Sequence, residues 1–150
     1  MHRHVTEGQI NFLWLQEHHL SKAKTEIYGS TMYGDWDHFW GQGYGAEENA
    51  RGVCIASRGV WRQQIVHAEI ITQGRAQFLI LEHGESRWGY LNVYAPNHAS
   101  ARARLWEEIY LSLPEDVENW IVGGDFNMLE DPQDRRGGSM ITIQGLELAN

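Results

Sequence analysis

Three strand-like segments joined by short glycine-containing turns occupy the middle of this chain and restrict it to folds built on an antiparallel sheet. Residues 64–72 alternate in polarity, and Gly74 makes a turn into the apolar segment 76–82. A second turn at 84–86 leads into a third segment, 89–94. Because turns of two to five residues join antiparallel neighbours, we expect a meander of three strands.

Further segments add strands on both sides of this meander. Residues 10–15 and 52–56 are apolar segments that we expect to be strands, and 120–122 predicts a short buried strand. Residues 21–49, rich in Gly, Trp and Tyr, are expected to be irregular. The period-two alternation of the first meander strand predicts two faces. Ile65, His67 and Glu69 would lie on one face, and Val66, Ala68 and Ile70 on the other.

One helix is indicated between the meander and the last strand. Its apolar residues recur at helical spacing, namely Leu105, Trp106, Ile109, Tyr110 and Leu113. Asn97 or Ser100 can cap its start, and Pro114 stops it. A second helix is expected from about Gly145. Strands with a helix crossing back over them suggest a sheet packed against helices or against a second sheet.

Length and composition favour one intracellular domain. The chain has 150 residues, which suits a single core. Its longest apolar runs are four residues, so neither a membrane span nor a signal peptide is expected. Cys54 is the only cysteine, which excludes an intrachain disulfide. We therefore expect a protein of the nucleus or cytoplasm that is not secreted.

Three short segments at the ends of expected strands carry candidate chemistry. Glu17 follows an apolar strand, where a rigidly held carboxylate suits a Mg²⁺ ligand; a solvated strand-end charge is the ordinary alternative. Tyr94 ends its strand before Pro96, and its phenol could donate to a phosphate oxygen. An ordinary strand-end tyrosine is the alternative there.

The third segment is Gly123-Gly124-Asp125-Phe126-Asn127, in which the two glycines allow a tight turn. Asp125 and Asn127 lie two residues apart, so an extended backbone would point both side chains the same way. A carboxylate that orients water beside an amide that holds phosphate forms a hydrolytic pair. A turn rich in Asx residues is the alternative interpretation.

In this order and at these separations, LQE at 15–17, NVYAPN at 92–97 and GGDFN at 123–127 resemble the motifs of the endonuclease/exonuclease/phosphatase superfamily. That superfamily includes deoxyribonuclease I and abasic-site endonucleases. LQEHHL is similar to the retroelement form of the first motif, LQETHL, with His18 in place of threonine. DFNMLEDPQDRRGG at 125–138 is similar to the endonuclease domains of LINE-type (non-LTR) retrotransposons of plants.

The resemblance implies an α+β fold, a deoxyribonuclease I-like two-layer β-sandwich flanked by helices, with the site at one rim. It implies that Glu17 binds Mg²⁺ or Mn²⁺, Tyr94 contacts the phosphate, Asp125 orients the attacking water, and Asn127 helps to bind the phosphate or transition state. DNA would be the substrate and a reverse transcriptase domain a partner. No membrane partner is expected.

The family pattern also contains parts that this sequence lacks. An asparagine on a strand well before the metal-binding glutamate has no counterpart, because only 16 residues precede Glu17. The Ser-Asp-His motif that supplies a second carboxylate and a histidine is absent. Residues 1–150 are therefore expected to form a single, incomplete domain, a sandwich truncated at both ends. We expect weak activity or none from it.

Three functional hypotheses follow. The first is a metal-dependent DNA endonuclease of retroelement type, present as a fragment. The second keeps the fold with another substrate, as a phosphomonoesterase or phospholipid-type hydrolase. The third is a retroelement remnant without catalysis. The net charge of −8 is unfavourable for gripping DNA by its phosphates, so positive charge would have to be local or come from a metal ion.

Other conspicuous residues have ordinary interpretations. His2, His4, His18 and His19 could suggest a metal cluster, but the first two lie near the terminus. Aromatic residues at Trp36, Trp40 and Tyr44 could stack on a base, although packing within the loop is the favoured interpretation. Arg135 and Arg136 could contact the DNA backbone or be solvated. Cys54 is expected to be a buried strand residue rather than a nucleophile.

Overall fold

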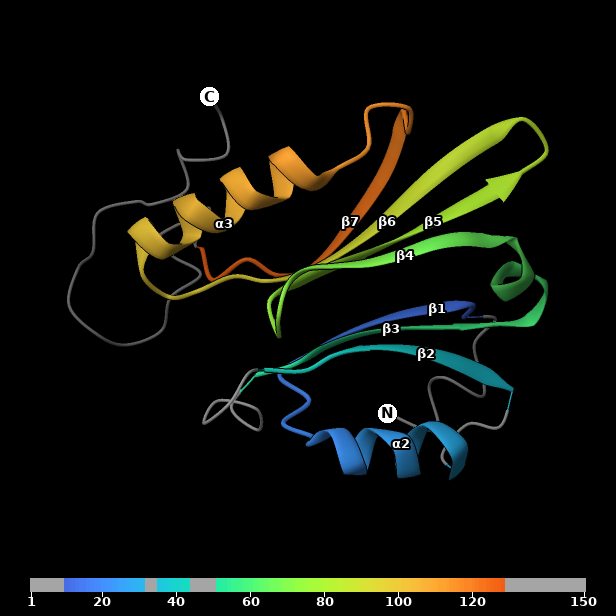
Figure 1. The fold of residues 1–150 in the computed structure, drawn as a ribbon, viewed down its shortest axis with the longest axis horizontal. Coiled ribbons are helices and arrows are strands. Elements are labelled where there is room, and N and C mark those ends of the chain that lie inside the picture. The colour runs from blue at the N-terminus through green and yellow to red at the C-terminus, as the bar shows by residue number, and fades with distance from the viewer. Residues whose placement is uncertain (1–9, 32–34, 44–50, 129–150) are drawn as a thin grey trace.

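Two β-sheets face each other in the computed structural model, which describes residues 10–31, 35–43 and 51–128 (Figure 1). The first sheet has the order β1-β3-β2 and is antiparallel throughout. The second has the order β4-β5-β6-β7, in which only the β6–β7 pair is parallel. The strands are β1 (Phe12–Gln16), β2 (Trp36–Gly41), β3 (Val53–Arg58), β4 (Ile65–Thr72), β5 (Ala76–His83), β6 (Ser86–Tyr94) and β7 (Asn119–Asp125).

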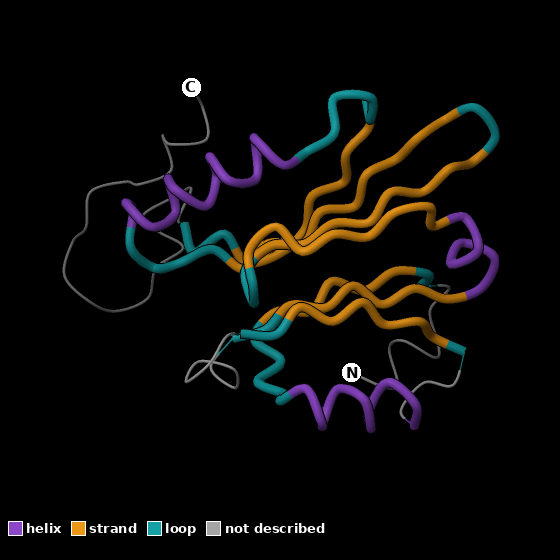
Figure 2. Tube along the Cα trace, viewed as in Figure 1, coloured by secondary structure: helices purple, strands orange, loops and turns teal. Residues whose placement is uncertain are grey.

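Helices cover the outer faces of both sheets. Figure 2 shows helix α2 (Lys22–Thr31) outside the first sheet and α3 (Ala99–Ser112) outside the second. A 3-10 helix, η2 (Gly59–Gln64), connects the sheets at the end opposite the β4–β5 turn. No helix in the described ranges is long and apolar enough to cross a membrane. The expected α+β sandwich with flanking helices is confirmed.

Aliphatic and aromatic side chains fill the space between the sheets. Ile55, Leu79 and Leu81 are buried there and are surrounded by partly buried aromatic residues of both layers. Phe12 and Trp14 of β1 stack on Tyr90 of β6, with ring centroids 4.6 and 5.7 Å apart. Since these contacts join strands far apart in the sequence, the two sheets are held as one unit by burial of apolar surface.

A second core lies between the outer face of the β4–β7 sheet and α3. Leu105 and Ile109 of the helix pack on Phe78 and its neighbours in the sheet. Trp120 of β7 meets Phe78 edge-on at 5.6 Å between ring centroids. A side chain at Gly89 would overlap the Trp120 ring, so this glycine makes room for the tryptophan.

The segment between β1 and β3 is more regular than the sequence predicted. Within the expected irregular stretch 21–49, α2 and β2 are formed. β2 pairs with β3 from Trp36 opposite Arg58 to Gly41 opposite Val53. The prediction was wrong because β2 (WDHFWG) lacks clean alternation and its aromatic side chains gain their burial only once it pairs with β3.

A bulge corrects the predicted faces of β4. The pairing with β5 shifts between Ile65 and His67, so Ile65 joins the core between the sheets. His67 instead lies on the outer face, with its ring 5.7 Å from that of Phe78. One inserted residue reverses the side to which later side chains point. The prediction that Ile65 and His67 share a face was therefore wrong.

Two further predictions at the ends of elements need correction. Helix α3 begins after His98, which makes no side-chain cap, so neither Asn97 nor Ser100 caps it. β7 is longer than the short buried strand predicted and runs through the two glycines to Asp125. It is also largely exposed, as Ile121 and Val122 show. The predicted helix near Gly145 lies outside the described residues.

Candidate active site

The carboxyl ends of β6 and β7 bring two candidate residues side by side. The strands are parallel because α3 carries the chain back across the sheet, and Tyr94 is the register partner of Asp125. The amide of Ala95 then donates to the carbonyl of Asp125 at 2.8 Å. Residues that the sequence separates by about thirty positions therefore share one rim of the sandwich.

The third candidate reaches the same rim from the other sheet. Glu17 follows β1, and the Tyr94 hydroxyl donates a hydrogen bond to its carboxylate. Glu17 has φ of +51°, in the left-handed region that side chains other than glycine seldom adopt. A conformation of this kind persists only where the surroundings impose it, and such positions concentrate at functional sites.

The Tyr94 phenol is held in its neutral form. Desolvation is the main cause that raises its pKa, and the hydrogen bond and negative charge of Glu17 add to it. The guanidinium of Arg75 lies 4.5 Å from the ring centroid and opposes part of this shift. Arg75 also donates to the carbonyls of Tyr94 and Ala95 at 3.3 and 3.4 Å. The phenol therefore keeps its proton at neutral pH and can donate a hydrogen bond.

Asp125 and Asn127 are joined by a turn rather than by extended backbone. Asn127 has φ of +49°, and its amide N–H donates to Asp125 Oδ1 at 2.9 Å. The Asn127 side chain turns back and donates through Nδ2 to the Ala95 carbonyl at 2.6 Å. The local geometry is thus the Asx turn given as the alternative above. It still holds both side chains at the end of β6.

The carboxylate of Glu17 suits a hydrated cation. Its side chain is 49% exposed, and Oε2 lies 3.8 Å from Nε2 of His19. No group of three His, Cys, Asp or Glu side chains that could hold a metal occurs among the residues described here. The donors present fit Mg²⁺ or Mn²⁺, because such ions keep several water ligands and need only one or two protein carboxylates.

His18 is a packing residue rather than part of a metal cluster. Its ring meets Trp40 edge-on at 5.2 Å and lies against Gly52, where any side chain would overlap it. Gly52 has φ of +142°. Burial lowers the pKa of His18, and the neighbouring His19 lowers it further. His18 of the LQEHHL motif is therefore in contact with Gly52, directly before β3.

The remaining candidates fall into two groups. Trp36 is buried in β2, and Trp40 stacks on His38 with 5.3 Å between ring centroids, which agrees with packing rather than base stacking. Cys54 is buried, and burial raises the pKa of its thiol far above the ordinary range, so a nucleophilic role is excluded. The residues His2, His4, Tyr44, Arg135 and Arg136 lie outside the described ranges.

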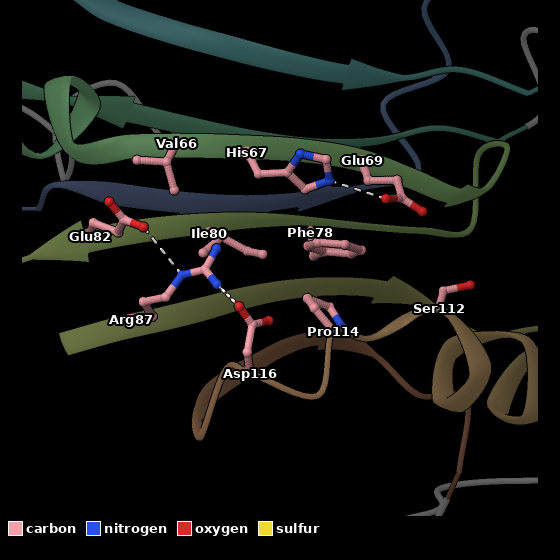
Figure 3. Close-up of a pocket in the computed structure, with 10 residues that line it drawn as sticks. All are labelled: Val66, His67, Glu69, Phe78, Ile80, Glu82, Arg87, Ser112, Pro114 and Asp116. Atoms are coloured by element: carbon pink, nitrogen blue, oxygen red, sulfur yellow. Dashed lines mark hydrogen bonds and ion pairs between the residues drawn. The ribbon is translucent and has the colours of Figure 1, made fainter. Parts of the chain in front are cut away.

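A shallow hollow of about 370 Å³ lies elsewhere, on the outer face of the β4–β6 strands beside the end of α3 (Figure 3). Phe78 and Ile80 lie beneath it. At its rim Arg87 pairs with Glu82 and Asp116. None of the four candidate residues lines this hollow, so it is separate from the rim site.

Three residues that build the site were not predicted from the sequence. Arg75 lies in the turn between β4 and β5 and gave no signal, since a charged turn residue is expected to be solvated. Gln16 and Asn92 belong to the LQE and NVYAPN motifs, but their side chains had no assigned role. Gln16 Nε2 donates to Asn92 Oδ1 at 2.7 Å, directly behind Glu17 and Tyr94. Their place in the motifs was the available signal.

Comparisons with known proteins give one curated relative of partial length. No protein-family model matches the chain. The "Transposon TX1 uncharacterized 149 kDa protein" of Xenopus laevis is 30% identical over 86 residues, which is 56% of this chain and 7% of that protein. The matched part is thus a small share of a much longer transposon protein.

Solved structures share the fold at low sequence identity. The AP endonuclease of Leishmania major has a TM-score of 0.64 at 14% identity and is matched over 91% of this chain and 52% of its own. Humanized D. rerio TDP2 has a TM-score of 0.60 at 16% identity, matched over 85% of this chain and 53% of its own. An endonuclease/exonuclease/phosphatase family protein of Leptotrichia buccalis has a TM-score of 0.56 at 16% identity, matched over 84% of this chain and 58% of its own. This chain spans about half the length of each. It therefore has the deoxyribonuclease I-like fold of the endonuclease/exonuclease/phosphatase proteins.

Proposed function

We propose that this chain is part of a metal-dependent phosphodiester hydrolase that cuts DNA, of the retroelement endonuclease type. The observation that carries the proposal is the hydrogen bond from Tyr94 to Glu17 across the two sheets, with Asp125 beside Tyr94 in register. An AP endonuclease and a TDP2 solved with a single-strand DNA product have this fold, and a transposon protein is similar in sequence. These relatives support DNA as the substrate.

Each residue of the rim has a proposed role that its surroundings permit. Asp125 orients a water molecule for in-line attack through its exposed carboxylate. Tyr94 has one O–H, which donates to Glu17 in this structure and would turn to a phosphate oxygen as negative charge develops there. Asn127 uses one N–H to hold Ala95 and, since an amide has two, offers the other to the phosphate. Glu17 would hold the cation through its half-exposed carboxylate.

A bound Mg²⁺ or Mn²⁺ would supply positive charge at the phosphate. The protein itself supplies little positive charge at the site. Among the contacts given for Glu17 and Tyr94, the basic residues are His19 and Arg75. With a net charge of −8, local cations matter more than a broad basic surface. We propose that DNA binding by this chain depends on the metal.

We further propose that residues 1–150 form a single incomplete domain of low activity, with a reverse transcriptase domain as a partner in the parent protein. The chain covers only 52–58% of the solved structures that share its fold, so roughly half of such a domain has no counterpart here. Catalytic groups that act as a unit lose most of their effect when one is missing. Weak nicking is therefore the expected activity.

Two measurements on the purified chain test the proposal. Mn²⁺ binding, followed by the loss of the free-ion signal in electron paramagnetic resonance, should weaken about 10-fold or more in Glu17→Gln. Nicking of supercoiled plasmid at low salt with Mg²⁺ should be slow in the parent chain. It should fall about 100-fold or more in Asp125→Asn and vanish with EDTA. Glu118→Gln, an exposed carboxylate outside the rim, is the matched control for both.

The outcomes separate the three hypotheses. Metal binding at Glu17 with DNA nicking supports the endonuclease. If the chain binds the metal and hydrolyses a phosphomonoester or phospholipid but does not cut DNA, the second hypothesis, a hydrolase of the same fold with another substrate, is supported. If the folded chain binds no Mn²⁺ and neither it nor a longer form of the parent protein cuts any phosphoester, the proposal is wrong and the chain is a remnant without catalysis.

A further inference from the structure

A buried amide spans the two sheets next to the rim. Asn92, on β6, is 0% exposed. Its Nδ2 donates to the carbonyl oxygens of Leu15 on β1 and Cys54 on β3, at 3.0 Å each. Its Oδ1 accepts a hydrogen bond from Nε2 of Gln16 at 2.7 Å. Asn92 is therefore bonded to two strands of the opposite sheet by both ends of its amide.

Such a group constrains position more strongly than apolar packing does. Apolar contacts between the sheets tolerate sliding, because their energy depends mainly on buried area. A fully buried amide loses stability sharply if its partners move out of reach, since each unpaired polar atom then bears its desolvation cost. Two donor bonds and one acceptor bond meet at Asn92, so they fix β1 relative to β6 at this point.

The fixed point lies immediately behind the candidate site. Glu17 follows Gln16 directly, and Tyr94 lies two residues after Asn92, so on the same face of β6. The Gln16–Asn92 bond thus joins the end of β1 to β6, and the Glu17–Tyr94 bond follows one residue later after β1 and two residues later on β6. Glu17 also has the left-handed backbone that needs support from its neighbours.

We propose that Gln16 and Asn92 are positioning residues, whose cross-sheet hydrogen bond sets the Glu17 carboxylate against the Tyr94 hydroxyl and so prepares the cation and phosphate sites. The inference rests on the proposed function for the roles of Glu17 and Tyr94. In this proposal Gln16 and Asn92 act only through Glu17 and Tyr94, without touching substrate or metal themselves.

Gln77 provides a matched control within the same layer. It is also fully buried, sits opposite Asn92 on the neighbouring strand β5, and donates through Nε2 to the carbonyl of Phe39 on β2 at 3.0 Å. It links the same two sheets by the same kind of bond. Neither β5 nor β2 carries a rim residue, so its loss should affect stability without moving Glu17 against Tyr94.

The test follows the Tyr94 phenol by NMR in the full chain with ¹³C-labelled tyrosine, assigned by Tyr94→Phe. Glu17→Gln defines the shift of the phenol when the carboxylate is lost. Gln16→Met keeps the length of the side chain and removes the donor to Asn92. We expect its Tyr94 resonance to move toward the Glu17→Gln position, and Mn²⁺ affinity to fall about 10-fold or more. Gln77→Met should leave both unchanged.

Each result decides between the alternatives. A Tyr94 resonance in Gln16→Met that equals that of the parent chain and of Gln77→Met overturns the positioning role. Should Gln16→Met fail to fold, Gln16→Glu, whose carboxylate opposes Asn92 Oδ1, is measured in its place with the same expectation. If the chain without substitutions binds no Mn²⁺ but Gln16→Met still moves the Tyr94 resonance, the proposed metal function fails and the positioning role stands.

Discussion

At the scale of single residues, Tyr94 connects the stability of the chain to pH. Its pKa lies above the ordinary value of about 10 because of burial first and Glu17 second. A folded-state pKa that is raised means that the unfolded chain loses the phenol proton first. Stability from this group is therefore complete below pH 10 and is lost as the pH rises from there through the higher folded-state value.

The measurement is a urea unfolding series between pH 8 and pH 11. The free energy of unfolding of the parent chain should fall with pH more steeply than that of Tyr94→Phe, which has no proton to lose. Glu17→Gln should lessen the difference without abolishing it, because desolvation is the larger cause. Equal slopes for the parent chain and Tyr94→Phe would contradict the burial of this phenol.

Arg75 is the second residue whose effect can be predicted. Its guanidinium packs on the Tyr94 ring and donates to two carbonyls at the end of β6. Arg75→Met keeps the apolar stem and removes these interactions, at an expected cost of about 1–3 kcal/mol in the free energy of unfolding. Thermal and urea unfolding measure it. A similar loss in Arg104→Met, an exposed helix position, would argue against a specific role for Arg75.

At the scale of elements, the sequence predicted the strands whose pattern is local. The β4–β6 meander could be predicted because tight glycine turns separate its strands. Helix α2 and strand β2 could not, because α2 has no strong apolar stripe and β2 gains its burial from β3. The three motif segments could be found at the ends of predicted strands, and the resemblance supplied their roles. Arg75 and the Gln16–Asn92 bond could not be predicted, because they depend on tertiary contacts.

Glycine positions give opposite predictions in two elements. Gly89→Ala adds a methyl group that overlaps Trp120, so the β6–β7 pair should loosen at a cost of about 1–3 kcal/mol. Gly29→Ala in α2 meets only Trp40 at 3.5 Å, an ordinary contact, and should stabilise the helix by up to about 1 kcal/mol. Urea unfolding of both variants measures the sign of each change in the free energy of unfolding. A stabilising Gly89→Ala would show that Trp120 has room to move.

At the scale of the whole molecule, the exposed apolar surface of β7 predicts how the chain behaves in solution. Parallel strands are normally covered on both faces, yet Ile121 and Val122 are 40% and 48% exposed. Being adjacent, they point to opposite faces of the sheet. Within the described part of the chain, β7 is the last strand of its sheet. An exposed apolar edge of this kind promotes pairing between molecules.

We therefore expect the chain to associate as its concentration rises, in a way that Ile121→Lys suppresses. A charge on an edge strand opposes pairing, and the half-exposed site should accept it at a cost of no more than about 1 kcal/mol. Light scattering and sedimentation velocity over a concentration series measure the association. Tyr110→Lys is the matched control, because Tyr110 is 81% exposed and belongs to α3 rather than to a strand. If Tyr110→Lys suppresses association as strongly as Ile121→Lys, net charge rather than the β7 edge controls it.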